Sequence, residues 1–129
     1  MKRPYVIINC AMSADGKIAL PNRKQLRISC DEDIKRMYNL RNEVDAVLVG
    51  IETILSDDPK LTVKEKYVKN PKHPLRVVLD GTCRTPKDAL ILNDSAKTLI
   101  IAGEGNEKQF DFEHVEVVGC KTDSGEHID

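Results

Sequence analysis

A short apolar stretch that stops at a glycine and leads straight into a helix constrains the fold of this chain most. Residues 44–49 are typical of a buried strand, and Gly50 follows them. Residues 51–56 have a brief helical pattern with Thr53 in the first turn, and an Asp-Asp-Pro sequence ends it. A helix N-terminus carries unpaired N–H groups and a positive dipole end, so phosphate binds there readily. The junction therefore predicts a nucleotide site.

Strand and helix patterns alternate along the rest of the chain. We expect strands at residues 5–12, 44–49, 75–80, 98–102 and 115–118. An amphipathic helix is expected at 33–41, and Ser29 with Glu32 matches a capping box before it. This order favours an α/β fold with a mostly parallel sheet.

Bulk composition excludes several classes of protein. The chain has 129 residues, which suffices for one domain, and its formal net charge of −1 gives no basic excess for nucleic acid. Aromatic residues make up only 4%, and the longest apolar runs are of strand length, so we expect no base-stacking platform and no membrane span. The four cysteines form no CxxC pair, which favours free thiols in a reducing cytoplasm over a zinc site or disulfides.

Polar residues follow two of the expected strands. Asp80-Gly81-Thr82-Cys83-Arg84 comes after the third strand, where ligands of open α/β sheets bind, and Arg84 could meet a phosphate. Asp15-Gly16-Lys17 follows the first strand, where Lys17 could hold a phosphate and Asp15 could take part in proton transfer. A plain turn explains Asp15-Gly16-Lys17 equally simply, and taken alone it is the favoured explanation of the segment after the third strand. No metal-ligand spacing and no nucleophile–base pair is evident, which is consistent with chemistry carried by a cofactor.

Several motifs together resemble one enzyme family. They are Met12 to Ala19, Arg27-Ile28-Ser29, Val44 to Gly50, Asp57 to Val63 with Thr53 before it, and Arg76 to Asp80. Their order and spacing resemble the pyrimidine reductases of riboflavin biosynthesis, including the archaeal diamino-ribosylamino-pyrimidinone phosphate reductases and the reductase half of the bacterial deaminase-reductase. The resemblance covers residues 4 to about 120. It implies a dihydrofolate-reductase-like three-layer fold around a mostly parallel sheet.

The resemblance also implies an activity and a set of site residues. NADPH would reduce the ribose of a ribosylaminopyrimidine 5′-phosphate to a ribityl chain, and the protein would be a cytoplasmic homodimer without a bound metal. The implied cofactor contacts are Gly50, Thr53, Asp57, Asp80, Gly81, Thr82 and Cys83. The implied substrate contacts are Ser29, Arg41, Leu61 and Lys64, and Asp15 and Lys17 are assigned catalytic roles. Taken alone, Arg41 also suits the negative end of a helix dipole.

One departure from the family pattern leaves an alternative open. Family members continue with a glycine-triplet loop for the NADPH pyrophosphate and an acidic substrate contact, and neither follows Val118. We therefore expect residues 1–129 to be the N-terminal part of a longer reductase domain, with 121–129 a loose tail. The alternative is a non-catalytic nucleotide-binding module on a decayed or truncated reductase scaffold. A dihydrofolate reductase is disfavoured because the chain has no Trp.

Overall fold

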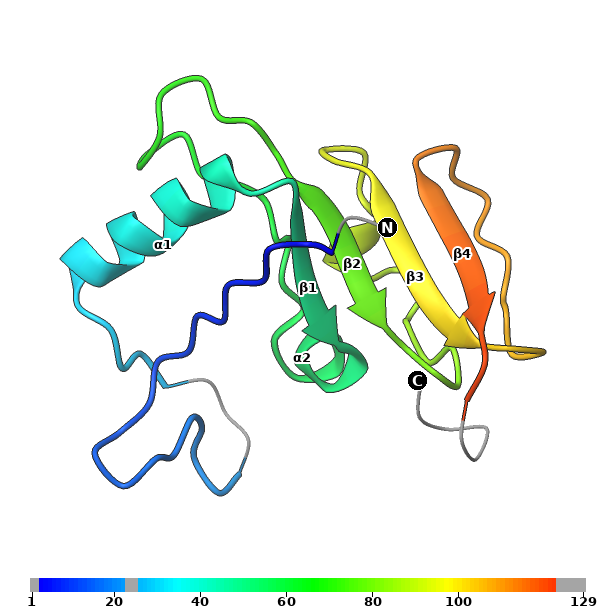
Figure 1. Ribbon diagram of the computed structural model, residues 1–129, viewed down its shortest axis with the longest axis horizontal. Coiled ribbons are helices and arrows are strands. Elements are labelled where there is room, and N and C mark those ends of the chain that lie inside the picture. Colours follow the sequence, from blue (N-terminus) through cyan, green and yellow to red (C-terminus); the bar gives the residue numbers. More distant parts are fainter. Residues whose placement is uncertain (1–2, 23–25, 123–129) are drawn as a thin grey trace.

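The computed structural model describes residues 3–22 and 26–122. In chain order its elements are α1 (Asp31–Glu43), β1 (Ala46–Gly50), α2 (Ile51–Asp57), β2 (Leu75–Leu79), the 3₁₀ turn η1 (Leu90–Leu92), β3 (Thr98–Gly103) and β4 (Val115–Cys120). Figure 1 shows the four strands side by side, with α1 beyond the β1 edge. The expected tail at 121–129 lies outside the described residues from 123 onward.

The four strands form one parallel sheet in the order β1-β2-β3-β4. Val49 pairs with Val78, and Ile100 pairs with Val78 on one side and Val117 on the other. Four of the five expected strands are therefore present, within two residues of their expected ends. The parallel α/β architecture is confirmed.

One face of the sheet carries the core. Because side chains alternate along a strand, Val49, Val78, Ile100 and Val117 share that face. Ile51 and Ile54 of α2, Leu61, and the segment Ala89–Leu92 pack against it. The core explains why residues 51–56 form a helix here: two isoleucines three positions apart cover the sheet.

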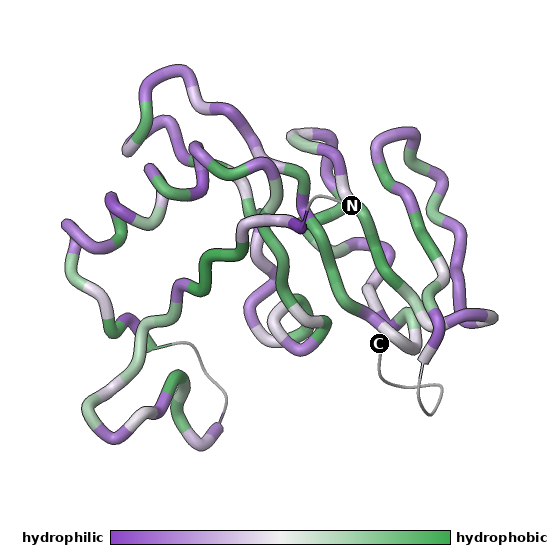
Figure 2. Tube along the Cα trace, in the orientation of Figure 1, coloured by the Kyte–Doolittle hydropathy of each residue, from purple (hydrophilic) through white to green (hydrophobic). Residues whose placement is uncertain are grey.

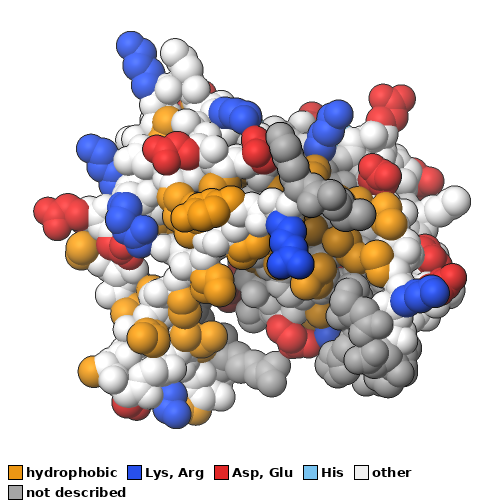
Figure 3. Space-filling view, viewed as in Figure 1, with side chains coloured by type: hydrophobic (Ala, Val, Ile, Leu, Met, Phe, Trp, Pro, Cys, Tyr) orange, Lys and Arg blue, Asp and Glu red, His pale blue; other side chains and the backbone are white. Residues whose placement is uncertain are grey.

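The other face of the sheet is less covered. Leu48 and Val118 lie on it, and they keep exposed fractions of 58% and 38%. Figure 2 shows that the strands are hydrophobic along most of their length, and Figure 3 shows hydrophobic side chains gathered over them.

The strand expected at residues 5–12 is absent, and that prediction was wrong. These residues have no strand assignment, and the expected buried side chains are exposed, with Tyr5 at 92% and Ile8 at 89%. An apolar run becomes a strand only where a neighbouring backbone pairs with it. Both edges of the described sheet, β1 and β4, run without this partner. The segment instead contacts α1, where Arg36 Nη2 donates to Asn9 Oδ1 at 2.8 Å.

The helix expected at 33–41 is confirmed as the longer α1, but its expected cap is wrong. The N-cap residue is Cys30, one position after Ser29, and it makes no side-chain cap hydrogen bond. Asp33, not Glu32, is therefore the third helical residue. The Ser29 hydroxyl hydrogen-bonds to the Asp33 carboxylate, and this bond, with Arg36 beside it, lowers the pKa of Asp33.

Candidate functional site

The β1–α2 junction has the geometry expected of a ligand site. Gly50 ends β1 and is the N-cap of α2, and a Cβ placed on it would meet nothing within 4 Å. Thr53 lies in the first turn of α2 and is half-buried. Space beside Gly50 and the N-terminus of α2 together leave room for an anionic group near the backbone.

The loop after β2 is built around a buried carboxylate. Asp80 is fully buried, and its Oδ1 accepts the Arg84 N–H at 2.8 Å. Its Oδ2 accepts the Thr85 N–H at 2.8 Å and the Thr85 hydroxyl at 2.7 Å. Three donors already occupy the Asp80 carboxylate, so this side chain shapes the loop and leaves Thr82 exposed at the sheet edge.

The end of β3 presses against the same loop. Gly103 N–H donates to the Gly81 carbonyl at 2.8 Å, and Asn106 Nδ2 donates to that oxygen at 3.0 Å. A Cβ on Gly103 would lie 2.8 Å from this carbonyl oxygen. Lys108 Nζ donates to the carbonyl of Cys83, a buried residue with a φ of +53°. Side chains near the β3–β4 connection thus hold the backbone of residues 81–83 in one shape.

An ion pair joins the two strand-end segments. Arg84 Nη2 lies 2.7 Å from Glu52 Oε1, and both side chains are about half exposed. Glu52 is in the first turn of α2, so the pair spans from the helix N-terminus to the loop after β2. A solvent-exposed pair of this kind stabilises the fold by at most about 1 kcal/mol. Arg84 can therefore exchange Glu52 for another partner at little cost in free energy.

Cations and aromatic rings gather where α1 meets the loop after α2. The rings of Tyr38 and Tyr67 stack with centroids 4.8 Å apart. Arg41 lies 5.2 Å and Lys64 Nζ 5.6 Å from the Tyr38 ring centroid. Arg41 Nη1 also donates to the Thr62 carbonyl at 3.0 Å, and burial lowers the pKa of its guanidinium. We call Tyr38, Arg41, Lys64 and Tyr67 the tyrosine–cation cluster.

Three further contacts fasten the same loop. Asn42 Oδ1 accepts the Lys72 N–H at 2.7 Å, and His73 Nδ1 accepts the Val63 N–H at 3.3 Å. Leu61 has a φ of +51° and is buried in the core. Its side chain therefore anchors the segment, while the backbone after it runs past Arg41.

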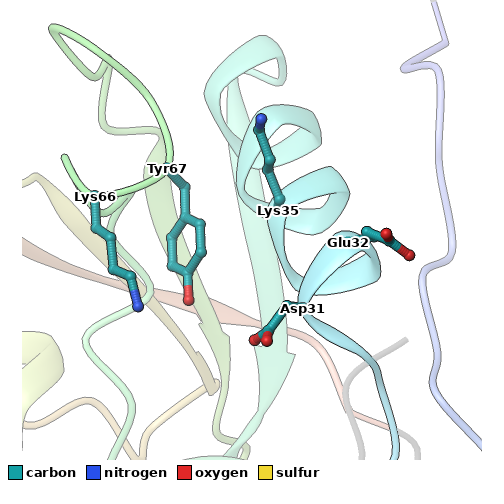
Figure 4. Close-up of a pocket in the computed structure, with 5 residues that line it drawn as sticks. All are labelled: Asp31, Glu32, Lys35, Lys66 and Tyr67. Carbon is teal, nitrogen blue, oxygen red and sulfur yellow. The ribbon is translucent and has the colours of Figure 1, made fainter.

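A groove runs between α1 and the turn at residues 64–68. It encloses about 360 Å³ and is lined by Asp31, Glu32, Lys35, Lys66 and Tyr67. Figure 4 shows Lys66 and Tyr67 on one side of it, facing the residues of α1. The Tyr67 ring is shared by this groove and the tyrosine–cation cluster.

Other predicted site residues lie apart from these groups. Arg41 is in the last turn of α1, about 15 Å along the helix axis from Asp31 at 1.5 Å per residue, and Ser29 lies before Asp31. Asp57 is exposed at the far end of α2 from Gly50. Asp15 accepts the Ser13 hydroxyl within a turn that the φ of +78° at Gly16 closes, and Lys17 is exposed there. In Figure 1 this turn lies away from the strand ends.

Some residues with clear roles in the structure were missed by the sequence reasoning. Arg76 is fully buried in β2, and the charge inside the apolar run 75–79 was a signal for it. Tyr38 gave a signal only as one of the apolar residues in the expected amphipathic helix at 33–41. Tyr67 and Lys108 lie in polar segments that gave no signal.

The described residues contain neither a metal-binding group of side chains nor a helix that could span a membrane. Within residues 3–22 and 26–122, no three His, Cys, Asp or Glu side chains come together in a group that could bind a metal ion. None of the helices in this part of the chain is both long and apolar enough to cross a bilayer.

Comparisons with known proteins agree with the resemblance. The chain is 56% identical over 105 residues to the 2,5-diamino-6-ribosylamino-4(3H)-pyrimidinone 5′-phosphate reductase of Archaeoglobus fulgidus, covering 76% of this chain and 48% of that relative. It is 48% identical over 102 residues to the Methanothermobacter thermautotrophicus protein of the same name, covering 79% and 47%. The chain thus spans about half the length of these relatives.

Solved structures agree on the fold. A Thermotoga maritima deaminase/reductase matches with a TM-score of 0.71 at 31% identity, covering 84% of this chain and 30% of that one. A Saccharomyces riboflavin biosynthesis reductase matches with a TM-score of 0.58 at 22% identity, covering 80% and 47%, which supports the fold alone. The family model described as the RibD C-terminal domain matches residues 4–128, and the chain belongs to that family.

Proposed function

We propose that the protein containing this chain is an NADPH-dependent reductase of riboflavin biosynthesis. It reduces the ribose of 2,5-diamino-6-ribosylamino-4(3H)-pyrimidinone 5′-phosphate to a ribityl chain. The observation that carries the proposal is the arrangement at the strand ends. Gly50, with open space beside it, joins the end of β1 to the N-terminus of α2, and the exposed Thr82 follows the end of the neighbouring strand β2. Nucleotides bind at these strand ends in α/β sheets.

The cofactor residues divide into contacts and supports. Gly50, Thr53 and Thr82 approach the cofactor, with Asp57 as a further contact at the end of α2. Asp80, Gly81 and Cys83 act through the loop that they shape, since the Asp80 carboxylate and the carbonyls of Gly81 and Cys83 already accept protein donors. Arg84 exchanges Glu52 for the 2′-phosphate of NADPH, which favours NADPH over NADH.

The substrate residues lie beside α1. Arg41 and Lys64 bring two cations together on one tyrosine ring, and such a pair suits the 5′-phosphate of the substrate. Leu61 supports this corner from the core, and Ser29 acts at the other end of α1. The cofactor supplies hydride to the substrate, while the protein aligns the two molecules and excludes water. Asp15 and Lys17 remain our catalytic candidates, on the turn that follows residues 5–12.

The proposal extends to the setting of the enzyme. Residues 1–129 form the N-terminal part of a single reductase domain, and the enzyme is a homodimer in the cytoplasm. Sedimentation velocity of the protein would show the mass of a dimer if the assembly is as proposed, and the mass of one chain if it is not.

NADPH oxidation tests the activity. The assay follows NADPH absorbance with the ribosylaminopyrimidinone 5′-phosphate as substrate, and the Archaeoglobus fulgidus relative serves as the positive control. Turnover by this protein supports the reductase assignment. If the relative turns over and this protein binds NADPH without turnover, the reductase assignment fails, and the non-catalytic nucleotide-binding module takes its place.

A further inference from the structure

We infer that the stacked pair Tyr38 and Tyr67 positions Arg41 and Lys64 for the substrate phosphate, as a support that touches the cations and not the reacting atoms. The inference rests on the proposed function, which places the phosphate at those two cations. It adds two positioning residues that lie on separate elements, α1 and the turn at 64–68.

The stacked rings connect α1 to the turn at residues 64–68. The rings of Tyr38 and Tyr67 are 8° from parallel, and Tyr38 is only 8% exposed. One ring belongs to α1 and the other to a turn 29 residues later, so the stack fixes the turn against the helix. An aromatic pair of this kind contributes stabilisation beyond the area that it buries.

The same stack influences the positions of Arg41 and Lys64. Lys64 begins the turn, and its carbonyl accepts the N–H groups of Tyr67 at 3.0 Å and Val68 at 3.2 Å. Moving Tyr67 therefore moves the backbone of Lys64. Arg41 is one helical turn after Tyr38 and lies over its ring, so the ring limits the rotamers that the guanidinium can adopt.

The two rings contact the cations that the phosphate would bind. Arg41 and Lys64 each lie within 6 Å of one ring centroid, and Lys66 Nζ lies 5.3 Å from the centroid of Tyr67. The electron-rich faces of the rings stabilise these positive charges. The guanidinium has five N–H donors, of which Thr62 accepts one, so a phosphate can bind to the same cation.

Binding measurements on ring variants test the inference. The variants are Tyr38→Leu, Tyr67→Leu and Tyr38→Phe, with Tyr5→Leu as the matched control because Tyr5 is 92% exposed and lies outside the cluster. Calorimetry gives the Kd for the ribosylaminopyrimidinone 5′-phosphate and for NADPH, and circular dichroism with thermal melting checks the fold. Two variants on separate elements keep the test valid if one of them unfolds.

The expected result is selective for the substrate. Each Leu variant weakens substrate binding about threefold to tenfold, while the Kd for NADPH stays within about twofold. Tyr38→Phe and Tyr5→Leu keep the wild-type substrate affinity, since a phenylalanine ring retains the π face. In turnover assays the Leu variants raise KM for the substrate more than they lower kcat.

Two outcomes overturn the inference in distinguishable ways. A folded Tyr38→Leu or Tyr67→Leu variant that binds substrate as tightly as the wild type refutes the positioning role and leaves the proposed function standing. A wild-type protein that does not bind the substrate at all, under conditions where the Archaeoglobus fulgidus relative binds it, refutes the proposed function and the inference together.

Discussion

Replacing Arg76 with methionine should destabilise the protein by about 3 kcal/mol. Arg76 is fully buried in β2, and its guanidinium is held by backbone and amide oxygens. Its Nη1 donates to Asn93 Oδ1 at 2.9 Å, and its Nη2 donates to the carbonyl oxygens of Asn93 and Ala96. A longer contact of 3.4 Å reaches the Lys60 carbonyl. Burial lowers the pKa of this guanidinium, with the charge of Asp94 opposing the shift.

The magnitude follows from what methionine can and cannot replace. Methionine fills much of the volume, but it leaves the acceptors of Asn93 and Ala96 without their donor. Hydrogen bonds to a charged group contribute about 1.5–3 kcal/mol each, so three of them at the lower bound contribute about 4–5 kcal/mol. Methionine also removes the buried Arg76 Nε–H, which has no partner in the described structure and costs about 1–2 kcal/mol. The difference is about 3 kcal/mol.

Urea unfolding followed by circular dichroism measures this change. With a slope of about 1.5 kcal/mol per M, the unfolding midpoint should fall by about 2 M, and the melting temperature by roughly 10 °C. Arg76→Lys is the matched control. Lysine keeps the positive charge but lacks the planar set of guanidinium N–H donors, so this variant should recover only part of the lost stability. A midpoint for Arg76→Met that equals or exceeds the wild type would show that the loop carbonyls do not need this donor, as when a buried ion pair is replaced by apolar residues.

Four further predictions follow from two glycines and from the Asp33 carboxylate. Gly103→Ala should lower the melting temperature, because its Cβ would lie 2.8 Å from the Gly81 carbonyl, whereas Gly50→Ala, with open space around it, should not. Gly50→Ala should instead weaken NADPH binding in a fluorescence titration, and unchanged affinity would remove Gly50 from the cofactor site. The pKa of Asp33 lies below its ordinary value in the folded state, so its contribution to stability is present above the unfolded pKa and is lost as pH falls through the folded pKa. Ser29→Ala should raise the pKa of Asp33 in an NMR titration, since the Ser29 hydroxyl is the largest cause of the shift; an unchanged pKa would contradict this.

The sheet could be predicted because its signal is local. Each of the four observed strands combines apolar residues with a glycine or aspartate at its end, and buried parallel strands need little else. The α2 helix was predictable for the same reason, from Gly50 to the acidic residues that end it. Residues 5–12 have a comparable pattern, but pairing depends on a distant backbone that no local pattern specifies. Residues 98–102 form a strand because neighbouring strands pair with them, whereas residues 5–12, with a similar apolar pattern, have no paired strand.

The candidate site was predictable only in part, for a related reason. Gly50, Gly81 and Thr82 lie at the carboxyl ends of the neighbouring strands β1 and β2, and the order of the elements already implied this. The Asp80 carboxylate is used within its own loop, where Cys83 has a φ of +53°, and no sequence pattern indicated either feature. Side-chain partners across long separations, such as Tyr67 on Tyr38, follow from the path of the loop and not from spacing.

The two groups of site residues are supported in different ways, and this separates the effects of mutation. Hydrogen bonds of the sheet and of the Asp80 loop hold the residues proposed to bind the cofactor, so damage there should lower global stability and the proposed cofactor affinity together. In the described residues, side chains of α1 hold the Lys64 turn, through the tyrosine stack and the bond from Arg41 to the Thr62 carbonyl. Such a local joint can loosen without unfolding the sheet. A variant of Arg76 should therefore change mainly the unfolding midpoint, while a folded variant of Tyr67 should change mainly the substrate affinity.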